Sequence, residues 1–330
     1  MMLQPGILAL LLGSGLGAVL LAAAVAPAVR IIRRWDLASG SEEQLRLERQ
    51  TYLVAAIMRL VMGFQIVFLF LFLQTVDGLA PMFIGAMCAA GSLKVNGFGY
   101  PALVAKILTC LLAGLWLILD ATDNRASDYP LIRTKYRLLL VITPVLLAET
   151  ALQALYLLGL EPNIITSCCA IVFSAGGGTV VATVLDVPLQ LSRAAFVLSA
   201  TLTLAAGWAV YRHGRGAILF AMASGCHFLL SIHALIAFIS LYVYELPTHH
   251  CPFCLLHREY GGIGYPLYLL LLTLAVTGLG TGLLHRYRAV PSLRTVIPAM
   301  QRRLALIALA ANAAFLLLVT GSMALSNLRL

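Results

Sequence analysis

The residues of this chain that are best suited to redox chemistry lie in one short polar stretch, residues 249–260. It contains Cys251 and Cys254 in a Cys-Pro-Phe-Cys motif, and a Cys-x-x-Cys can cycle between a dithiol and a disulfide. A thiolate in such a motif is favoured by a helix N-terminus or a nearby cation, and His257 and Arg258 supply candidate cations. We therefore assign the two cysteines as candidate catalytic residues. An inert structural disulfide is the alternative.

Three more cysteines fall beside the apolar runs, and we include Cys88, Cys168 and Cys169 as candidate catalytic residues. A disulfide between adjacent cysteines is strained, and two adjacent thiolates bind soft metals well. One hypothesis is that Cys88 or the adjacent pair exchanges a disulfide with the Cys-x-x-Cys motif. The alternative for the adjacent pair is packing in an interfacial turn. Cys110 and Cys226 lie inside apolar runs, and we predict that they are small core residues.

The polar stretch also permits a metal site. His249 and His250 come directly before the motif and His257 follows it, so sulfur and imidazole ligands for zinc, copper or haem iron lie close together in the sequence. The alternative is that these histidines are exposed at the lipid head groups.

The rest of the chain is that of a polytopic membrane protein. Of its 330 residues 61% are hydrophobic and 11% are charged, and the mean hydropathy is +0.96. Apolar runs of about 20 residues recur, and each is long enough to cross a bilayer as a helix. We find no phosphate loop, nucleophile elbow or soluble domain. We predict an all-α fold with about eight transmembrane helices, near residues 5–27, 51–75, 101–120, 138–159, 196–211, 217–243, 264–284 and 303–323.

The distribution of basic residues predicts the orientation. Sixteen of the 22 Lys and Arg residues fall in four segments, 30–50, 121–137, 212–215 and 286–303. Positive segments mark the cytoplasmic side. We therefore predict a multi-pass protein of the bacterial inner (plasma) membrane, with both termini and the Cys-x-x-Cys motif outside, in an oxidising compartment. The net charge of +9 thus reflects topology, and we expect membrane lipid as a partner and no nucleic acid.

Residues 35–50 of the first segment are also predicted to form an interfacial cytoplasmic helix that runs into the second span.

Two landmarks recur in the same order and predict a parallel tandem repeat of four-helix units. A Gly-x-Gly-Tyr-Pro sequence occurs at residues 97–101 and again at 262–266, and each copy is followed, one helix later, by Pro-x-x-Arg-Thr. We predict an anchor helix plus a four-helix unit over residues 1–211, and a second, partial unit with the Cys-x-x-Cys loop over residues 212–330. The alternative is a coincidence between loops that need Gly, Tyr and Pro at a membrane interface.

Ionisable residues inside apolar runs are candidates for a proton path or a cofactor pocket. Glu149 lies near mid-depth, with Arg59, His227 and His233 at comparable depths, where an ionisable group costs a few kcal/mol unless it is paired. We expect Glu149 to face the bundle interior, against Arg59 or a histidine. We assign Glu149 and His227 as candidate cofactor-binding residues, with a structural ion pair as the alternative. Lys106 is expected to snorkel outward.

The motif and its neighbours resemble the membrane thiol oxidases of the disulfide-bond formation B and vitamin K epoxide reductase-like type. Those proteins carry Cys-x-x-Cys, two apolar residues, a Gln or Glu and an Arg at the mouth of a helix, and some have Tyr-Pro-Leu shortly afterwards. Here Arg258 and Tyr265-Pro266-Leu267 match, whereas His257 replaces the Gln or Glu, and the resemblance covers about 17 residues. It implies electron transfer from a periplasmic thioredoxin-fold partner to a membrane quinone near Arg258, His257 and Tyr265.

The leading hypothesis is therefore a membrane thiol–disulfide oxidoreductase that couples outer cysteines to a quinone. One alternative is a soft-metal (Hg, Cu or Zn) transporter or carrier, because Ser167-Cys168-Cys169 also resembles a feature of bacterial mercury-uptake membrane proteins. Another is a membrane subunit that holds quinone or haem among the subunits of a respiratory complex.

Overall fold

The computed structural model describes residues 4–36, 39, 41–162, 164–166 and 187–329. Cys168 and Cys169, two of the candidate catalytic residues, lie outside this part of the chain.

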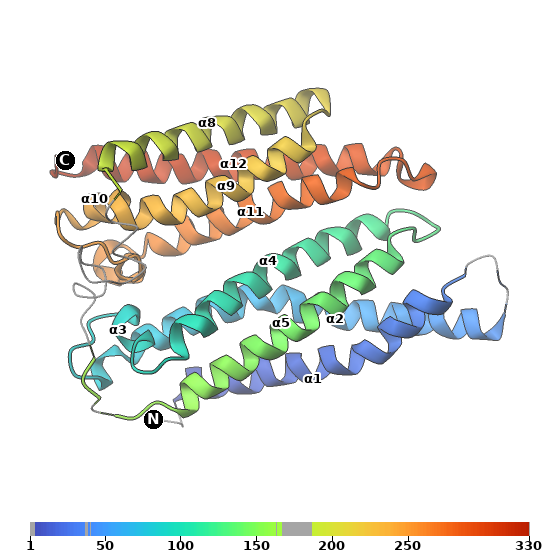
Figure 1. Cartoon of the computed structure of the whole chain (residues 1–330), viewed down its shortest axis with the longest axis horizontal. Helices are drawn as coiled ribbons and strands as arrows, with labels where there is room; N and C mark the ends of the chain where they lie inside the picture. Colours follow the sequence, from blue (N-terminus) through green and yellow to red (C-terminus); the bar gives the residue numbers. More distant parts are fainter. Residues whose placement is uncertain (1–3, 37–38, 40, 163, 167–186, 330) are drawn as a thin grey trace. The chain divides into compact units, whose positions relative to one another are not determined.

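Eight helical segments in the described residues are long and apolar enough to cross a membrane, which confirms the predicted all-α polytopic fold (Figure 1). These are α1 (Pro5–Arg34), α2 (Glu42–Gly78, extended by the short η1, Ala80–Met82), α4 (Gly99–Asp123), α5 (Ile132–Leu158), α8 (Leu189–His213), the segment made of α9 (Ala217–Ala234), the π-helical turn η2 (Leu235–Ile239) and α10 (Ser240–Tyr244), α11 (Gly264–His285) and α12 (Val296–Leu325). Shorter helices connect them: α3 (Ala89–Leu93), η3 (Phe253–Leu256), η4 (Arg258–Tyr260) and η5 (Pro291–Leu293).

The charged residues before the second span belong to α2, so the prediction of a helix that runs into this span is confirmed from Glu42 onward. No Gly or Pro interrupts the sequence from residue 42 to the apolar run, and nothing there ends the helix. Glu42 and Glu43 lie in the first turn, where negative charge interacts favourably with the helix dipole. The charged first part of α2 is therefore continuous with its membrane-spanning part.

Contacts divide the chain into two compact units. The first unit contains residues 1–75, 96–161 and 287–297, and the second contains residues 76–95, 162–286 and 298–330. The predicted repeat, with its division at residue 211, is defined by sequence landmarks rather than by contacts and stays a prediction. In the structure, Gly99-Tyr100-Pro101 begins α4 and Gly264-Tyr265-Pro266 begins α11, so the last three residues of each copy begin a spanning helix.

In the first unit, α5 packs against both α1 and α4. Gln153 of α5 is fully buried and donates through Nε2 to the carbonyl oxygen of Leu10 in α1, at 3.1 Å, while Ser14 donates to its Oε1 at 3.5 Å. Such hydrogen bonds stabilise helix pairs in a bilayer because lipid offers no alternative partner. Trp116 of α4 is also fully buried and donates to the carbonyl oxygen of Lys135.

In the second unit, α9 packs against α8 and α11. The α9–α11 contact is built on small residues: Gly278 of α11 faces the side chain of Ser224, and Gly282 faces the Cβ of Ala221. The spanning helix α12 is joined to α11 by a hydrogen bond of 2.8 Å from Gln301 to the carbonyl oxygen of Thr281. The Cys-x-x-Cys segment follows α10 and precedes α11, so it lies at the opposite end of these two helices from the basic turns at residues 212–215 and after His285.

Candidate functional site

Three cysteines from two distant parts of the sequence form one cluster in the second unit. The Sγ atoms of Cys88 and Cys251 lie 3.5 Å apart, and the Sγ atoms of Cys88, Cys251 and Cys254 all lie within 4.8 Å of one another. The three residues are 0%, 1% and 5% exposed. We call this group the sulfur cluster. It brings together the Cys-x-x-Cys motif and one of the three additional cysteines that the sequence put forward.

Short helical turns position the three sulfur atoms. Cys88 is the residue that precedes the first turn of α3, and it has an extended backbone. Cys254 lies within η3, whereas Cys251 precedes it. Two tyrosines fix the motif through its backbone: Tyr244 donates to the carbonyl oxygen of Cys251, and Tyr268 donates to that of Pro252, each at 2.5 Å. The ends of α10 and α11 therefore hold the motif in place.

Asp77 links the two chain segments that form the sulfur cluster. Its Oδ1 accepts a hydrogen bond from the backbone N–H of Ala89, next to Cys88, at 2.9 Å. The same oxygen lies 2.9 Å from Nε2 of His257, three residues after Cys254. Sequence reasoning missed Asp77. The available signal was a lone acid at the polar end of a long apolar run, in the segment that leads to a cysteine.

The candidate metal ligands His249 and His250 do not join the sulfur cluster. Nδ1 of His250 lies 2.9 Å from the carbonyl oxygen of Ile236 in the π-helical turn, and the ring of His249 packs edge-on against Tyr244 at 4.8 Å. Within the described residues, the only group of three or more His, Cys, Asp or Glu side chains close enough to share a metal ion is the sulfur cluster itself. Any metal at this site would therefore have sulfur ligands.

The three residues assigned to a quinone lie near the motif. Arg258 is exposed in η4, and Tyr265 is partly buried in the first turn of α11, within electrostatic range of Arg258 and Asp77. His257 is engaged by Asp77. The exposed guanidinium and the tyrosine hydroxyl are the donors in this region that suit the carbonyl oxygens of a quinone.

The other two candidate cofactor residues belong to different units and have local partners. Glu149 in the first unit is 1% exposed and accepts from Nζ of Lys106 at 2.5 Å. His227 in the second unit is fully buried, its Nδ1 lies 2.8 Å from Oγ of Ser199, and its ring packs against those of Phe196 and Phe315.

Two expectations about these buried charges are wrong. Lys106 does not snorkel outward, because it is 3% exposed and its ammonium group is held by Glu149. Glu149 is therefore not paired with Arg59 or a histidine, and Arg59 instead contacts Asp120. Pairing inside the bundle satisfies both charges without moving either one to the interface.

The two cysteines predicted to be core residues have different surroundings. Cys110 is buried in α4, as expected, whereas Cys226 is exposed on α9 and that prediction is wrong. Its neighbour His227 occupies the buried face of the helix, and consecutive helical residues point about 100° apart.

Comparisons of the chain with protein-family models, with curated proteins and with solved structures found no match.

Proposed function

We propose that this protein is a membrane thiol–disulfide oxidoreductase and that the sulfur cluster is its redox centre. The observation that carries the proposal is the contact of 3.5 Å between the sulfur atoms of Cys88 and Cys251, with Cys254 in the same cluster. A thiolate at that distance from a disulfide sulfur is positioned for exchange once it lies in line with the bond. The resemblance of the motif to membrane thiol oxidases supports the same activity.

In the proposed exchange, the thiolate of Cys88 attacks Sγ of Cys251 in a Cys251–Cys254 disulfide. The new Cys88–Cys251 bond forms as the old bond breaks, and Cys254 leaves as a thiolate and takes up a proton. The number of disulfides is unchanged by this step. The net reaction removes two electrons and two protons from an external dithiol, for which we propose a thioredoxin-fold protein.

The final acceptor that we propose is a membrane quinone, which when bound takes up the two electrons and two protons. Arg258 and Tyr265 are the residues that we assign to its carbonyl oxygens, since both offer donors beside the motif. Because all three sulfur atoms are buried, exchange with an external partner requires movement of the segment around η3 and η4. The two turns contain four and three residues, and such short helices are less costly to displace than a spanning helix.

We further propose that the site lies at the outer face of a bacterial plasma membrane, with both termini outside. The motif lies at the end of α10 and α11 opposite the basic turns, and basic segments mark the cytoplasmic side. Disulfide chemistry is sustained in the oxidising compartment outside that membrane.

Replacing the third sulfur tests the exchange directly. In a Cys254→Ser variant, oxidation with diamide should produce a Cys88–Cys251 disulfide, because Cys254 can no longer compete for Cys251. Thiol oxidation coupled to quinone reduction should be abolished. Mass spectrometry of peptides with and without reductant identifies the bond, and Cys110→Ser serves as the matched control with a buried cysteine outside the cluster. Absence of this crosslink, or unchanged turnover in Cys254→Ser, would contradict the proposal.

A second function is favoured by the geometry of the sulfur cluster: binding of a soft metal ion such as Cu(I), Zn²⁺ or Hg²⁺, as in a carrier or transporter. Sulfur ligands about 2.3 Å from a metal lie about 3.8 Å apart, so the observed cluster needs only small movements to hold one. Elemental analysis after purification under reducing conditions separates the two functions. About one metal ion per chain, lost in Cys88→Ser, would indicate the metal site, whereas metal-free protein with a trapped disulfide indicates exchange.

A further inference from the structure

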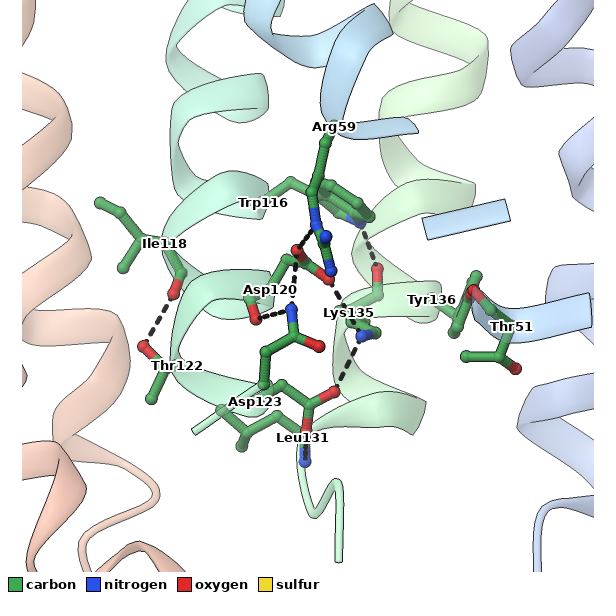
Figure 2. A network of polar contacts seen from close by, with 11 residues as sticks. Thr51, Arg59, Trp116, Ile118, Asp120, Thr122, Asp123, Leu131, Lys135 and Tyr136 are labelled. Atoms are coloured by element: carbon green, nitrogen blue, oxygen red, sulfur yellow. Dashed lines mark hydrogen bonds and ion pairs between the residues drawn. The ribbon is translucent and has the colours of Figure 1, made fainter. Parts of the chain in front are cut away.

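The first unit contains a polar network that the thiol chemistry does not use (Figure 2). At its centre the carboxylate of Asp120 accepts from Nε of Arg59 at 2.5 Å, from Nζ of Lys135 at 3.0 Å and from Nδ2 of Asn124 at 3.0 Å. Lys135 also lies 2.9 Å from Oδ2 of Asp123. Two cations and two carboxylates therefore balance, and the network is neutral without a ligand.

A cavity of about 320 Å³ lies against one side of this network. It is lined by Trp35, Glu48, Thr51, Tyr52, Ala55, Arg59, Asn124, Ser127, Tyr129 and Lys135. Both cations of the network are among the lining residues, whereas their partners Asp120 and Asp123 are not. The side chain of Lys135 is 1% exposed and that of Arg59 is 44% exposed, so Arg59 is the cation of the network that is accessible.

The guanidinium of Arg59 has N–H donors beyond the one that contacts Asp120. A guanidinium carries five N–H groups in a planar fork, and the contact with Asp120 uses the one on Nε. The side chain is 44% exposed, whereas that of Asp120 is 3% exposed, so the accessible side of the ion pair is the guanidinium. Its terminal nitrogens have the geometry that binds a carboxylate or phosphate through two oxygens.

Thr51 provides a second and independent indication of a ligand. It lines the cavity and is only 8% exposed, yet its Oγ1 has no hydrogen-bond partner among the described residues. A buried hydroxyl without a partner is costly, and an oxygen acceptor in the cavity would satisfy it. Thr51 lies eight residues before Arg59 on α2, so one helix supplies both of these lining residues.

The remaining walls offer both apolar and polar surface to a ligand. Trp35, Tyr52 and Tyr129 combine flat ring faces with polar edges, and Ser127 adds a hydroxyl. Glu48, the one acidic lining residue, lies eleven residues before Arg59 on α2 and can accept from a hydroxyl or an ammonium group of the ligand.

We propose that this cavity binds an oxyanion, a phosphate or carboxylate attached to a small polar body, and that Arg59 and Thr51 hold its oxygen atoms. Two sources carry this chemistry, the head group of an anionic phospholipid and a soluble phosphorylated or carboxylated compound. The inference is independent of the sulfur cluster, because every residue in it belongs to the first unit.

The test uses the full-length protein in phosphatidylcholine nanodiscs. Inorganic phosphate and glycerol 3-phosphate are titrated while thermal unfolding is followed, with chloride at equal ionic strength as the reference. In parallel, nanodiscs that contain phosphatidylglycerol are examined by native mass spectrometry for retained lipid. Stabilisation by the free phosphates identifies a soluble ligand, and retention of phosphatidylglycerol without such stabilisation identifies a lipid head group.

Three variants make the test specific. Arg59→Gln should weaken binding of the effective probe about tenfold or more, and Thr51→Val, which keeps the shape of the side chain, should weaken it about two- to tenfold. Arg125→Gln removes an exposed arginine of the turn after α4 that does not line the cavity, and it should leave binding unchanged. Failure of every probe to bind, or equal binding in Arg59→Gln, Thr51→Val and the unaltered protein, would overturn the proposal.

Discussion

At the scale of single residues, Asp77 shows how the sulfur cluster is kept together. One carboxylate oxygen serves two donors, the backbone of Ala89 beside Cys88 and the ring of His257 after the motif. It therefore joins the segment from residue 76 to residue 95 to the Cys-x-x-Cys segment by polar contacts. Because the side chain of Asp77 is about 25% exposed, each contact contributes less to the folding free energy than a fully buried one. Their main effect is to fix the positions of the two segments that supply the cysteines.

We predict that Asp77→Ala slows formation of the Cys88–Cys251 disulfide in the Cys254→Ser background. Both hydrogen bonds are lost, each worth about 1 kcal/mol, so the two cysteines should meet less often and the rate should fall about threefold or more. The measurement is the rate of crosslinking with diamide. Glu259→Gln, which removes an exposed acid in η4, is the control and should leave the rate unchanged. An unaltered rate in Asp77→Ala would show that packing alone positions the sulfur atoms.

At the scale of the elements, the close approach of α9 and α11 depends on small residues. A Cβ added at Gly278 would overlap the side chain of Ser224, and one added at Gly282 would overlap the Cβ of Ala221. In a bilayer such close contact replaces the hydrophobic effect as a source of helix association. The consequence for the site is direct, because the motif is held between the end of α10, which continues from α9, and the start of α11.

We predict that Gly278→Val destabilises the second unit by about 1–3 kcal/mol, because α9 and α11 must separate or distort to admit the larger side chain. The melting temperature should fall, and the sulfur cluster should become accessible to alkylating reagents. Gly321→Val is the matched control, since a Cβ at Gly321 in α12 meets no atom within 4 Å. Equal stability of the two variants would mean that the α9–α11 contact is not as close as the structure shows.

At the scale of the whole molecule, the number of spans and the basic segments together decide the topology that we propose. The spans found in the part of the chain that the structure describes number eight, and an even number returns the chain to the side on which it began. The basic residues gather at the helix ends and connections where α1 meets α2, α4 meets α5, α8 meets α9 and α11 meets α12. Under the positive-inside rule, each of these four junctions is cytoplasmic.

We predict that reporters fused to either terminus lie outside the cytoplasm. A C-terminal alkaline phosphatase should be active and a C-terminal green fluorescent protein should be dark, whereas the same reporters inserted after Ser127 should show the reverse. Fluorescence from the C-terminal fusion would indicate the opposite orientation. The cysteine motif would then lie on the reducing side of the membrane, where a disulfide is not sustained.

The parts of the fold that were predictable are those encoded in local sequence. The eight spans follow from apolar runs, because the free energy of transferring a run of residues into lipid depends on its own side chains. The start of one span was wrong, because the basic residues before it were interpreted as a loop: α5 begins at Ile132, ahead of Arg133 and Lys135. Lys135 is tolerated there because Asp120 and Asp123 pair with it.

The sequence by itself determined that this protein is built of membrane-spanning helices with a Cys-x-x-Cys motif between two of them. Only the tertiary structure decided which side chains meet: Cys88 with Cys251 across 163 residues, Lys106 with Glu149, and Arg59 with Asp120. Such contacts depend on how each helix is rotated about its axis and on which neighbour it packs against. Rotation and packing are set by how well all the helices fit together, so they cannot be predicted from any one segment of the sequence.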